Sequence, residues 1–265
     1  MGAGRMATAL ARGLVRAEMV PATAIVACDP SDDARRAFLN EVPGTTVEQG
    51  NAADVARADV VILAVKPQTM SAALDSIRDS IDAKSLVVSI AAGITVARLE
   101  GALPKAQRVV RVMPNTPCLI GLGASGYALG THATKEDGQL VASLLSAVGA
   151  AFEVSEKLLD AVTGLSGSGP AFVYSMIEAL AAGGVAEGMS PELAGELAAR
   201  TVAGAAEMVL QTGETPAVLR DRVTSPGGTT LAGLGVLRER GFGETVSDAV
   251  KAATRRSIEL GQIAK

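Results

Sequence analysis

The sequence has very few aromatic residues and very few of the side chains that bind metals. Aromatic residues make up 2% of its 265 residues, tryptophan is absent, and there are one histidine and two cysteines. Nucleic-acid recognition by base stacking needs aromatic side chains, and a His/Cys metal site needs more ligands than these. The composition therefore argues against both kinds of site, and no metal is expected.

The chain also lacks an excess of positive charge and a long uninterrupted apolar run. Its formal net charge is −4 and its pI is near 5.2, which argues against a nucleic-acid partner. The two cysteines, Cys28 and Cys118, lie far apart in apolar contexts, as reduced thiols do. The most apolar window, 170–185, contains Glu178 and is too short to span a bilayer. We expect a cytoplasmic protein without nucleic-acid or membrane partners.

Up to about residue 155 the sequence alternates strand and helix patterns. The apolar runs 59–65 and 85–90 are typical of strands buried on both faces, and Thr134 with Asp137 predicts a helix start. This alternation predicts an α/β, doubly wound, mostly parallel sheet. Only helices are predicted afterwards, with apolar faces that suit a second copy of the chain. We therefore expect a dinucleotide-binding domain at 1–155 and a helical dimerisation domain at 156–265.

The chain opens on a glycine-rich turn of the pattern G-x-G-x-x-G/A, which binds the pyrophosphate of a dinucleotide. The turn consists of Gly2, Ala3, Gly4, Arg5, Met6 and Ala7. The strand that precedes such a turn is absent, so we expect a weakened sheet and cofactor site. Placing an apolar segment of about five to eight residues before the turn should raise thermal stability and tighten NADPH binding.

An acidic residue follows the predicted strand 24–28, at the position where these folds contact the cofactor's ribose. This residue, Asp29, favours the ribose hydroxyls of NAD and repels a 2′-phosphate. Ser31, Arg35 and Arg36 lie nearby and could offset that repulsion. The preference between NADPH and NADH therefore stays open from these residues.

A second glycine-rich stretch runs through 223–231. Ser225 is a good N-cap and Pro226 suits the first helical position, so a helix is predicted to begin here and to run toward Arg240. Two glycines in its first turn would each cost about 1 kcal/mol against alanine. They would also leave the first-turn amides open to a carboxylate or phosphate. The alternative is a glycine-rich helix start that binds nothing.

Six stretches together make the sequence resemble the pyrroline-5-carboxylate reductase family over essentially the whole chain. They are residues 2–7, 64–67, 89–93, 113–117, 164–171 and 225–230. The resemblance implies a Rossmann domain, NADPH or NADH as hydride donor, and a helical dimerisation domain. It also implies an active site shared between subunits, and dimers often assembled into rings. The implied reaction reduces 1-pyrroline-5-carboxylate to L-proline, the last step of proline biosynthesis.

The resemblance also assigns roles to individual residues. It places the diphosphate on residues 2–7. It places Asn51, Ala64, Val65, Lys66 and Pro67 on the adenosine side of the cofactor. It places Ala91, Ala92 and Gly93 beside the nicotinamide. The residues expected around the substrate are Glu214, Ser225, Gly227, Gly228, Thr229 and Thr230. Thr230 is the expected catalytic residue and should lie near the ring nitrogen. Some members carry a cofactor-contacting Asn where this chain has Arg222, so that role is not carried over.

The implied reaction needs no acidic side chain, and two alternative functions stay open. An imine arrives partly protonated, so Thr230 need only orient its nitrogen and no acidic side chain is required. A β-hydroxyacid dehydrogenase shares the architecture, but its chemistry needs a base, usually a lysine, and residues 170–190 contain none. A non-catalytic NADP-binding dimer is the other alternative. We expect His132 to be a surface or capping residue and Glu178 an interface residue.

Overall fold

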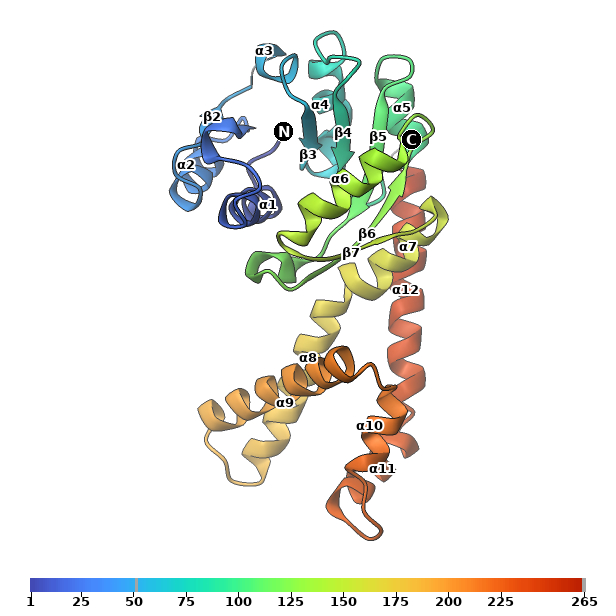
Figure 1. Cartoon of the computed structure of the whole chain (residues 1–265). Coiled ribbons are helices and arrows are strands. Elements are labelled where there is room, and N and C mark those ends of the chain that lie inside the picture. The colour runs from blue at the N-terminus through green and yellow to red at the C-terminus, as the bar shows by residue number, and fades with distance from the viewer. Residues whose placement is uncertain (51, 264–265) are drawn as a thin grey trace. The chain divides into compact units, whose positions relative to one another are not determined.

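The computed structural model describes residues 1–50 and 52–263 (Figure 1). Asn51, expected to contact the adenosine, lies outside the described residues. The chain divides into two compact units. The first comprises residues 1–168 and the end of the chain from Lys251, and the second comprises Gly169–Val250. This division differs from the expected domain boundary at residue 155, which stays a prediction.

The first unit contains a five-stranded sheet in the order β3-β4-β5-β6-β7. Its strands are β3 (Val60–Leu63), β4 (Leu86–Ser89), β5 (Arg108–Met113), β6 (Gly123–Leu129) and β7 (Gly149–Glu153). All neighbours are parallel except β5 and β6. The predicted mostly parallel sheet is confirmed. Strand β7 was missed because its residues are only partly buried and show no continuous apolar run.

A separate two-stranded parallel sheet joins β1 (Val26–Cys28) to β2 (Thr46–Glu48). The predicted strand at 24–28 begins two residues late, because Ala22–Ala24 form the short 3₁₀ helix η1. Met1 and Gly2 lie between the two sheets. The Gly2 amide donates to the carbonyl of Cys28 at 2.7 Å, and the Met1 carbonyl accepts from the Ala64 amide at 2.8 Å.

Helices cover the sheets of the first unit. They are α1 (Arg5–Arg16), α2 (Asp32–Glu41), α3 (Ala52–Val55), α4 (Met70–Ile77), α5 (Val96–Ala102), α6 (Lys135–Ser146), α7 (Leu159–Val162) and the end of α12 (Phe242–Ile263). Helix α6 begins with the predicted capping box of Thr134 and Asp137. Aliphatic side chains from α4, β3 and β4 form one part of the core, including the fully buried Leu63 and Leu74.

A buried arginine attaches the last helix to the sheet of the first unit. Arg111 on β5 has a side chain that is 5% exposed and lies 3.2 Å from Glu156 and 3.7 Å from Asp160. The hydroxyl of Ser257 on α12 donates to Asp160 at 2.7 Å. Glu156 also accepts from the Val96 amide at 2.6 Å, at the start of α5. This network joins a strand to three separate helical segments.

The glycine- and serine-rich stretch 164–170 has the composition of a turn, but it is helical. Helix α7 continues into the π-helix η5 (Thr163–Gly167), and α8 (Gly169–Ala186) follows. The hydroxyl of Ser166 donates to the Val162 carbonyl at 3.1 Å, so it bonds within the helix and does not end it. A Cβ on Gly167 would lie 2.6 Å from the methyl group of Met113, so the flexible end of that side chain would have to shift.

The second unit consists of helices. Besides α8 they are α9 (Pro191–Thr212), α10 (Pro216–Arg222), α11 (Thr229–Glu239) and the beginning of α12, up to Val250. Their ends have typical capping residues: Ser190 and Thr215 begin α9 and α10, and Gly213 ends α9 with a left-handed φ of 67°. Helices α8 and α9 pack closely where Gly184 faces Ala194.

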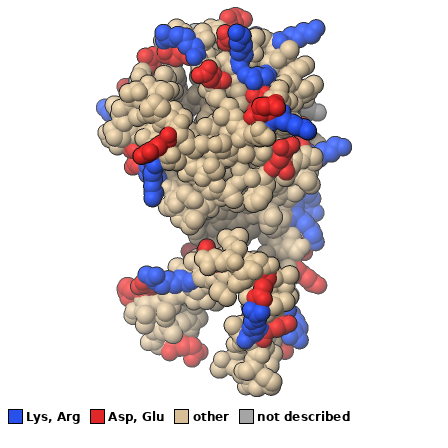
Figure 2. All heavy atoms as spheres, in the orientation of Figure 1, with Lys and Arg blue, Asp and Glu red and all other residues tan. Residues whose placement is uncertain are grey.

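The helices of the second unit expose much apolar surface. Exposed side chains include those of Val173, Leu180, Leu193, Leu197, Val236 and Leu237. Figure 2 shows broad areas of the molecule free of charged side chains. By length and composition alone, the helical run Glu156–Ala186 is long and apolar enough to cross a membrane. Exposed apolar faces of this size mark a surface that meets another apolar partner.

Candidate active site

The glycine-rich turn leads into α1 with an open helix tip. Gly2 has a φ of +89°, and a Cβ there would lie 2.7 Å from the Ala64 carbonyl oxygen, so only glycine fits. Gly4 is the N-cap of α1 and forms no side-chain cap. A Cβ at Gly4 would meet nothing within 4 Å. The first amides of α1 therefore face an accessible surface, which suits the diphosphate of a dinucleotide.

Asp29 lies against this turn at the carboxyl end of β1. Its carboxylate accepts from the amides of Ala3 and Ser31, each at 2.9 Å. The sequence-based expectation had linked Asp29 to the ribose, and the structure brings it to the phosphate-binding turn as well. Two backbone amides hold this carboxylate in place, so its charge is fixed beside the expected cofactor path.

Both arginines that follow Asp29 form ion pairs with acidic neighbours. Arg35 pairs with Asp32 and also donates to the Asp29 carbonyl at 2.6 Å. Arg36 pairs with Asp33 at 2.8 Å. From the sequence we expected that these arginines could offset the repulsion between Asp29 and a 2′-phosphate. Because each already has a carboxylate, they offset the charge of Asp29 less than isolated arginines would.

The two other expected cofactor stretches follow β3 and β4 at the same edge of the sheet. Residues 64–67 leave β3 beside Gly2, and Lys66 is exposed where the 3₁₀ helix η2 (Pro67–Thr69) begins. Residues 91–93 leave β4, and the Ile90 amide donates to the Leu63 carbonyl at 3.1 Å. The structure thus gathers residues 2–7, 64–67 and 91–93 at the carboxyl edge, where such sheets bind ligands.

The last turns of α12 cover the expected nicotinamide loop. Gly93 is buried with a φ of +75°, and a Cβ there would lie 3.3 Å from the Gly261 amide nitrogen. A Cβ on Gly261 would in turn lie 3.0 Å from the Gly93 carbonyl oxygen. The sequence gave no signal for this contact between residues so far apart in the chain. The helix end therefore helps to fix the loop 91–93.

The predicted helix start at Ser225 and Pro226 is wrong. Helix α11 begins at Thr229 with Gly228 as its N-cap, and residues 225–228 form a turn closed by the Gly228 amide and the Ser225 carbonyl at 2.9 Å. Gly227 has a φ of +72°. Pro followed by Gly is favoured at the centre of such a turn, and this preference overrides the helix start. The glycines therefore carry no cost of a helix interior.

The corrected helix start still has an open N-terminus, three residues later than expected. Gly228 offers no side-chain cap, and a Cβ there would lie 2.4 Å from the Ser225 hydroxyl oxygen. Thr229 is exposed and Thr230 half-buried on the first turn. The first amides of α11 and two hydroxyls can thus bind a carboxylate. This turn and tip lie in the second unit, and the cofactor stretches lie in the first.

Glu214 pairs with Arg222, which the sequence had left without a role. The two guanidinium nitrogens of Arg222 donate to the two carboxylate oxygens of Glu214 at 2.5 and 2.6 Å. This bidentate pair spans α10 and ends three residues before the 225–228 turn. Glu214 is therefore a paired carboxylate. Sequence spacing alone could not reveal the pair, because the fold of α10 sets the distance.

The remaining candidates lie on surfaces of the single chain. His132 and Glu178 are both exposed. Within the described part of the chain, no group of three or more His, Cys, Asp or Glu side chains could hold a metal ion. A cavity of about 430 Å³ lies between β1 and β3, and its walls are largely apolar, so it does not suit a pyrophosphate.

A dinucleotide-type turn on a mostly parallel sheet, followed by helices with a second open tip, defines a nicotinamide-dependent oxidoreductase with a helical dimerisation region. Two family models agree with this class. The model of NADP oxidoreductase coenzyme F420-dependent matches residues 1–93, and that of pyrroline-5-carboxylate reductase dimerisation matches residues 156–260. The chain belongs to the pyrroline-5-carboxylate reductase family.

Individual relatives cover nearly the whole chain. It is 46% identical to pyrroline-5-carboxylate reductase of Methanosarcina acetivorans, over 99% of this chain and 97% of the relative. The identity to the Arabidopsis thaliana enzyme is 47%, over 99% and 94%. The structure from Coxiella burnetii is similar with a TM-score of 0.91 and 37% identity, covering 98% of this chain and 96% of that one. The NADP-bound structure from Plasmodium falciparum has a TM-score of 0.86, 34% identity and the same coverage.

Proposed function

We propose that this protein reduces 1-pyrroline-5-carboxylate to L-proline with a hydride from a nicotinamide cofactor, as the final step of proline biosynthesis. The proposal rests on two helix N-termini that have no side-chain cap, each beside a glycine-rich turn. The tip of α1 suits a diphosphate, and the tip of α11 suits the carboxylate of a small acid. Family membership over the whole chain supports the same activity.

In this proposal the substrate carboxylate binds to the amides at the start of α11. Gly227 and Gly228 keep the approach free of side chains, and the Ser225 and Thr229 hydroxyls lie beside it. The Thr230 hydroxyl orients the ring nitrogen and is the catalytic residue. The paired Glu214 positions the chain that leads into the 225–228 turn.

The cofactor occupies the carboxyl edge of the sheet in this proposal. Residues 2–7 bind the diphosphate, residues 64–67 and Asn51 lie along the adenosine, and residues 91–93 lie beside the nicotinamide. When bound, the reduced cofactor supplies the hydride for the imine carbon. A protonated imine already carries the proton that the product nitrogen keeps, so the chain needs no acidic side chain at this step.

We further propose that the ribose side favours NADH over NADPH. The Asp29 carboxylate is fixed beside the phosphate-binding turn, and Arg35 and Arg36 are paired with acids. A 2′-phosphate would bring two negative charges toward this acid, whereas ribose hydroxyls can donate to it. The sequence alone left the preference between NADPH and NADH open, and the paired arginines shift it toward NADH.

Self-association completes the proposal. The apolar faces of the second unit pack against a second copy, and dimers can assemble into rings. The helical run 156–186 meets protein and not lipid, because it carries Glu178 and three further charged residues before residue 161, and the acidic Glu187 follows its other end. The protein is cytoplasmic and has no nucleic-acid or membrane partner.

The test is an imine-reduction assay with 1-pyrroline-5-carboxylate and each cofactor in turn. We expect oxidation of NADH, with slower oxidation of NADPH, and formation of proline. A β-hydroxyacid dehydrogenase would ignore the imine, and a non-catalytic dimer would bind the cofactor without turnover. Either result would overturn the proposed activity.

A further inference from the structure

The loop after β5 has no role in the proposed function, although it lies at the same edge of the sheet as the expected cofactor stretches. Residues 91–93 follow β4, and residues 114–117 follow β5. The two strands are parallel neighbours, with Ser89 opposite Arg111. Their carboxyl ends therefore lie side by side, and the loop 114–117 is the neighbour of the loop expected beside the nicotinamide.

The strand order places this loop at the nicotinamide end of the expected cofactor path. Asp29, expected at the ribose, follows β1, and the five-stranded sheet continues in the order β3-β4-β5. A dinucleotide that runs from Asp29 across the turn 2–7 to residues 91–93 has β5 as the next strand beyond its nicotinamide. Any side chain of the loop 114–117 that reaches the edge therefore meets that end of the cofactor first.

One side chain of this loop, Asn115, is buried with only half of its amide group paired. The residue is 8% exposed, and its Oδ1 accepts from the Ala124 amide at 2.9 Å, at the start of β6. A backbone amide can only donate, so the atom that faces it is the oxygen. Among the described residues, none accepts from the Asn115 nitrogen. The side chain thus holds two N–H donors in a fixed orientation without a protein acceptor.

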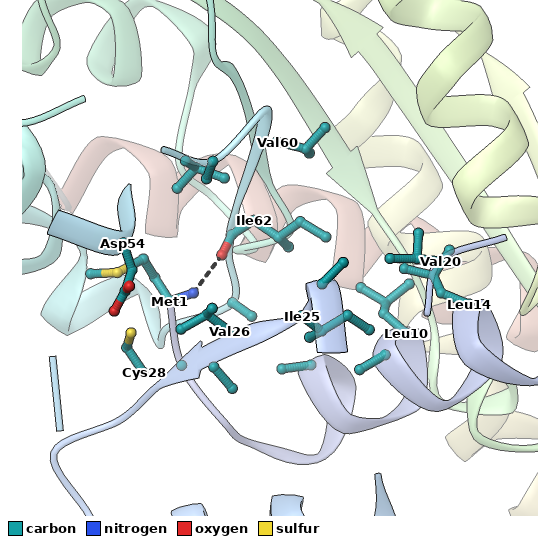
Figure 3. A pocket seen from close by; sticks show the side chains of 18 of the residues that line it. Met1, Leu10, Leu14, Val20, Ile25, Val26, Cys28, Asp54, Val60 and Ile62 are labelled. Atoms are coloured by element: carbon teal, nitrogen blue, oxygen red, sulfur yellow. Dashed lines mark hydrogen bonds between the residues drawn. The ribbon is translucent and has the colours of Figure 1, made fainter. Parts of the chain in front are cut away.

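The unpaired nitrogen of Asn115 differs from other unpaired polar atoms in the described part of the chain. Three of those atoms are fully enclosed and belong to Asp54, Arg98 and Gln107. Figure 3 shows Asp54 at the apolar cavity between β1 and β3, and its other oxygen pairs with Arg57 at 3.1 Å. The Asn115 nitrogen is not enclosed in this way, so a ligand can reach it.

The backbone around Asn115 is held before any ligand binds. Pro114 and Pro117 fix their own φ angles, and each also restricts the residue before it. Asn115 is extended, with a φ of −134° and a ψ of 167°. The 3₁₀ helix that follows is attached to α1, because the Arg12 guanidinium donates to the Leu119 carbonyl at 2.5 Å. The loop therefore presents its donor with little freedom to lose on binding.

We propose that Asn115 is a cofactor-binding residue whose amide nitrogen donates to the carboxamide oxygen of the nicotinamide. The inference rests on the proposed use of a nicotinamide cofactor. Asn115 offers only donors at its free side, so the matching ligand group is an acceptor, and the nicotinamide carries a carbonyl oxygen on its ring. The substrate carboxylate is already assigned to the amides of α11. Holding the carboxamide fixes the rotation of the ring and thus the direction of C4, which gives the hydride.

The experiment compares the unaltered full chain with Asn115→Asp, Asn115→Ala and Asn40→Asp. Asn115→Asp keeps an oxygen for the Ala124 amide and replaces the donor with an acceptor, whereas Asn115→Ala removes the donor without adding charge. Asn40→Asp, at an exposed asparagine of α2, is the matched control. Calorimetry gives the Kd of three ligands: NADH, its reduced thionicotinamide analogue, and ADP-ribose, which lacks the nicotinamide. The phosphorylated forms replace all three if NADPH binds more tightly than NADH.

We expect the unaltered chain and the control to bind NADH more tightly than the thio analogue, because sulfur is the weaker acceptor. Asn115→Ala should weaken NADH binding about three- to tenfold, and Asn115→Asp about tenfold or more, since it sets a carboxylate against the carboxamide oxygen. The Kd of ADP-ribose should stay within about twofold. The preference for NADH over the thio analogue should disappear in Asn115→Ala.

Three results would each overturn the proposal. They are unchanged NADH binding in both Asn115 variants, equal losses for NADH and ADP-ribose, and a preference over the thio analogue that persists in Asn115→Ala. An unaltered chain that binds neither NADH nor NADPH would overturn it as well. The measurements use no imine, so a chain that binds the cofactor but does not reduce the imine refutes the reductase activity and leaves this test intact.

Discussion

At the scale of single residues, the candidate site depends on backbone geometry more than on ionisable groups. Gly227 has a left-handed φ, a Cβ on Gly228 would displace the Ser225 hydroxyl, and Gly2 packs against the carbonyl of Ala64. Such positions expose amides where a Cβ would cover them. The charged groups nearby are mostly paired. Catalysis in such a site relies on placing two bound partners together.

Changing the turn before α11 should affect substrate binding and turnover separately. We expect Gly227→Val to raise KM for the imine, because a β-branched residue at a φ of +72° is strained by about 1–3 kcal/mol. Thr230→Ala should lower kcat about 10²-fold through loss of the orienting hydroxyl. Steady-state kinetics measure both. Thr201→Ala, at an exposed threonine of α9, is the control. Unchanged kinetics in the combined Gly227→Val, Thr230→Ala variant would refute the assigned roles.

Asp29 should control cofactor choice. We expect Asp29→Asn to raise kcat/KM for NADPH relative to NADH about tenfold, because the negative charge facing the 2′-phosphate is removed. The measurement is the ratio of kcat/KM for the two cofactors at constant imine concentration. Asp75→Asn, at an acid paired with Arg78 on α4, serves as the control. A ratio that stays constant in Asp29→Asn would exclude this residue from cofactor selection.

The Met1 ammonium should make folding stability depend on pH. Burial lowers its pKa below the ordinary value of 8.0, while Cys28 and Asp29 act in the opposite direction and Asp54 lines the same cavity. The unfolded chain therefore binds more protons between the folded pKa and about 8, so this group makes stability rise with pH across that window. Urea unfolding from about pH 6 to about pH 8 measures the slope. Acetylation of Met1 should flatten it, and an unchanged slope would contradict this origin.

At the scale of elements, short-range signals set most helix starts, and long-range contacts fix the helices in place. Thr95, Thr134, Ser190 and Thr215 are residues of the type favoured at N-caps, and each caps a helix. The end of α12, by contrast, is held by the polar network around Arg111 and by its contact with Gly93. This helix end supports the loop expected beside the nicotinamide.

Breaking the Arg111 network should destabilise the first unit. We expect Arg111→Ala to lower the free energy of unfolding by about 3–5 kcal/mol, because it leaves Glu156 and Asp160 without their buried cation. Urea denaturation measures the loss. Arg16→Ala, at an exposed arginine, should change stability by less than about 0.5 kcal/mol. A similarly small change in Arg111→Ala would show that the network contributes little.

At the scale of the whole molecule, the two units carry different parts of the proposed reaction. The cofactor stretches belong to the first unit and the substrate turn to the second. The second unit also exposes the apolar helix faces expected to bind another copy. Oligomer formation and catalysis should therefore depend on each other.

A charge on an apolar helix face should test this dependence. We expect Leu180→Glu to convert the oligomer to a monomer and to reduce turnover, because a carboxylate in an apolar interface is costly to bury. Light scattering gives the molar mass, and the imine assay gives turnover. Leu39→Glu, at an exposed leucine of the first unit, should leave both unchanged. A Leu180→Glu oligomer of normal mass would place the interface elsewhere.

The sequence by itself determined the family, the mostly parallel sheet and most helix caps, because periodicity, caps and motifs act within a few residues. It also located the two glycine-rich stretches. Only the tertiary structure decided that Arg222 pairs with Glu214 and that Asp29 binds the Ala3 amide. It alone placed α12 against Gly93. These contacts join residues that local rules cannot relate, and the distances between them exist only once the chain has folded.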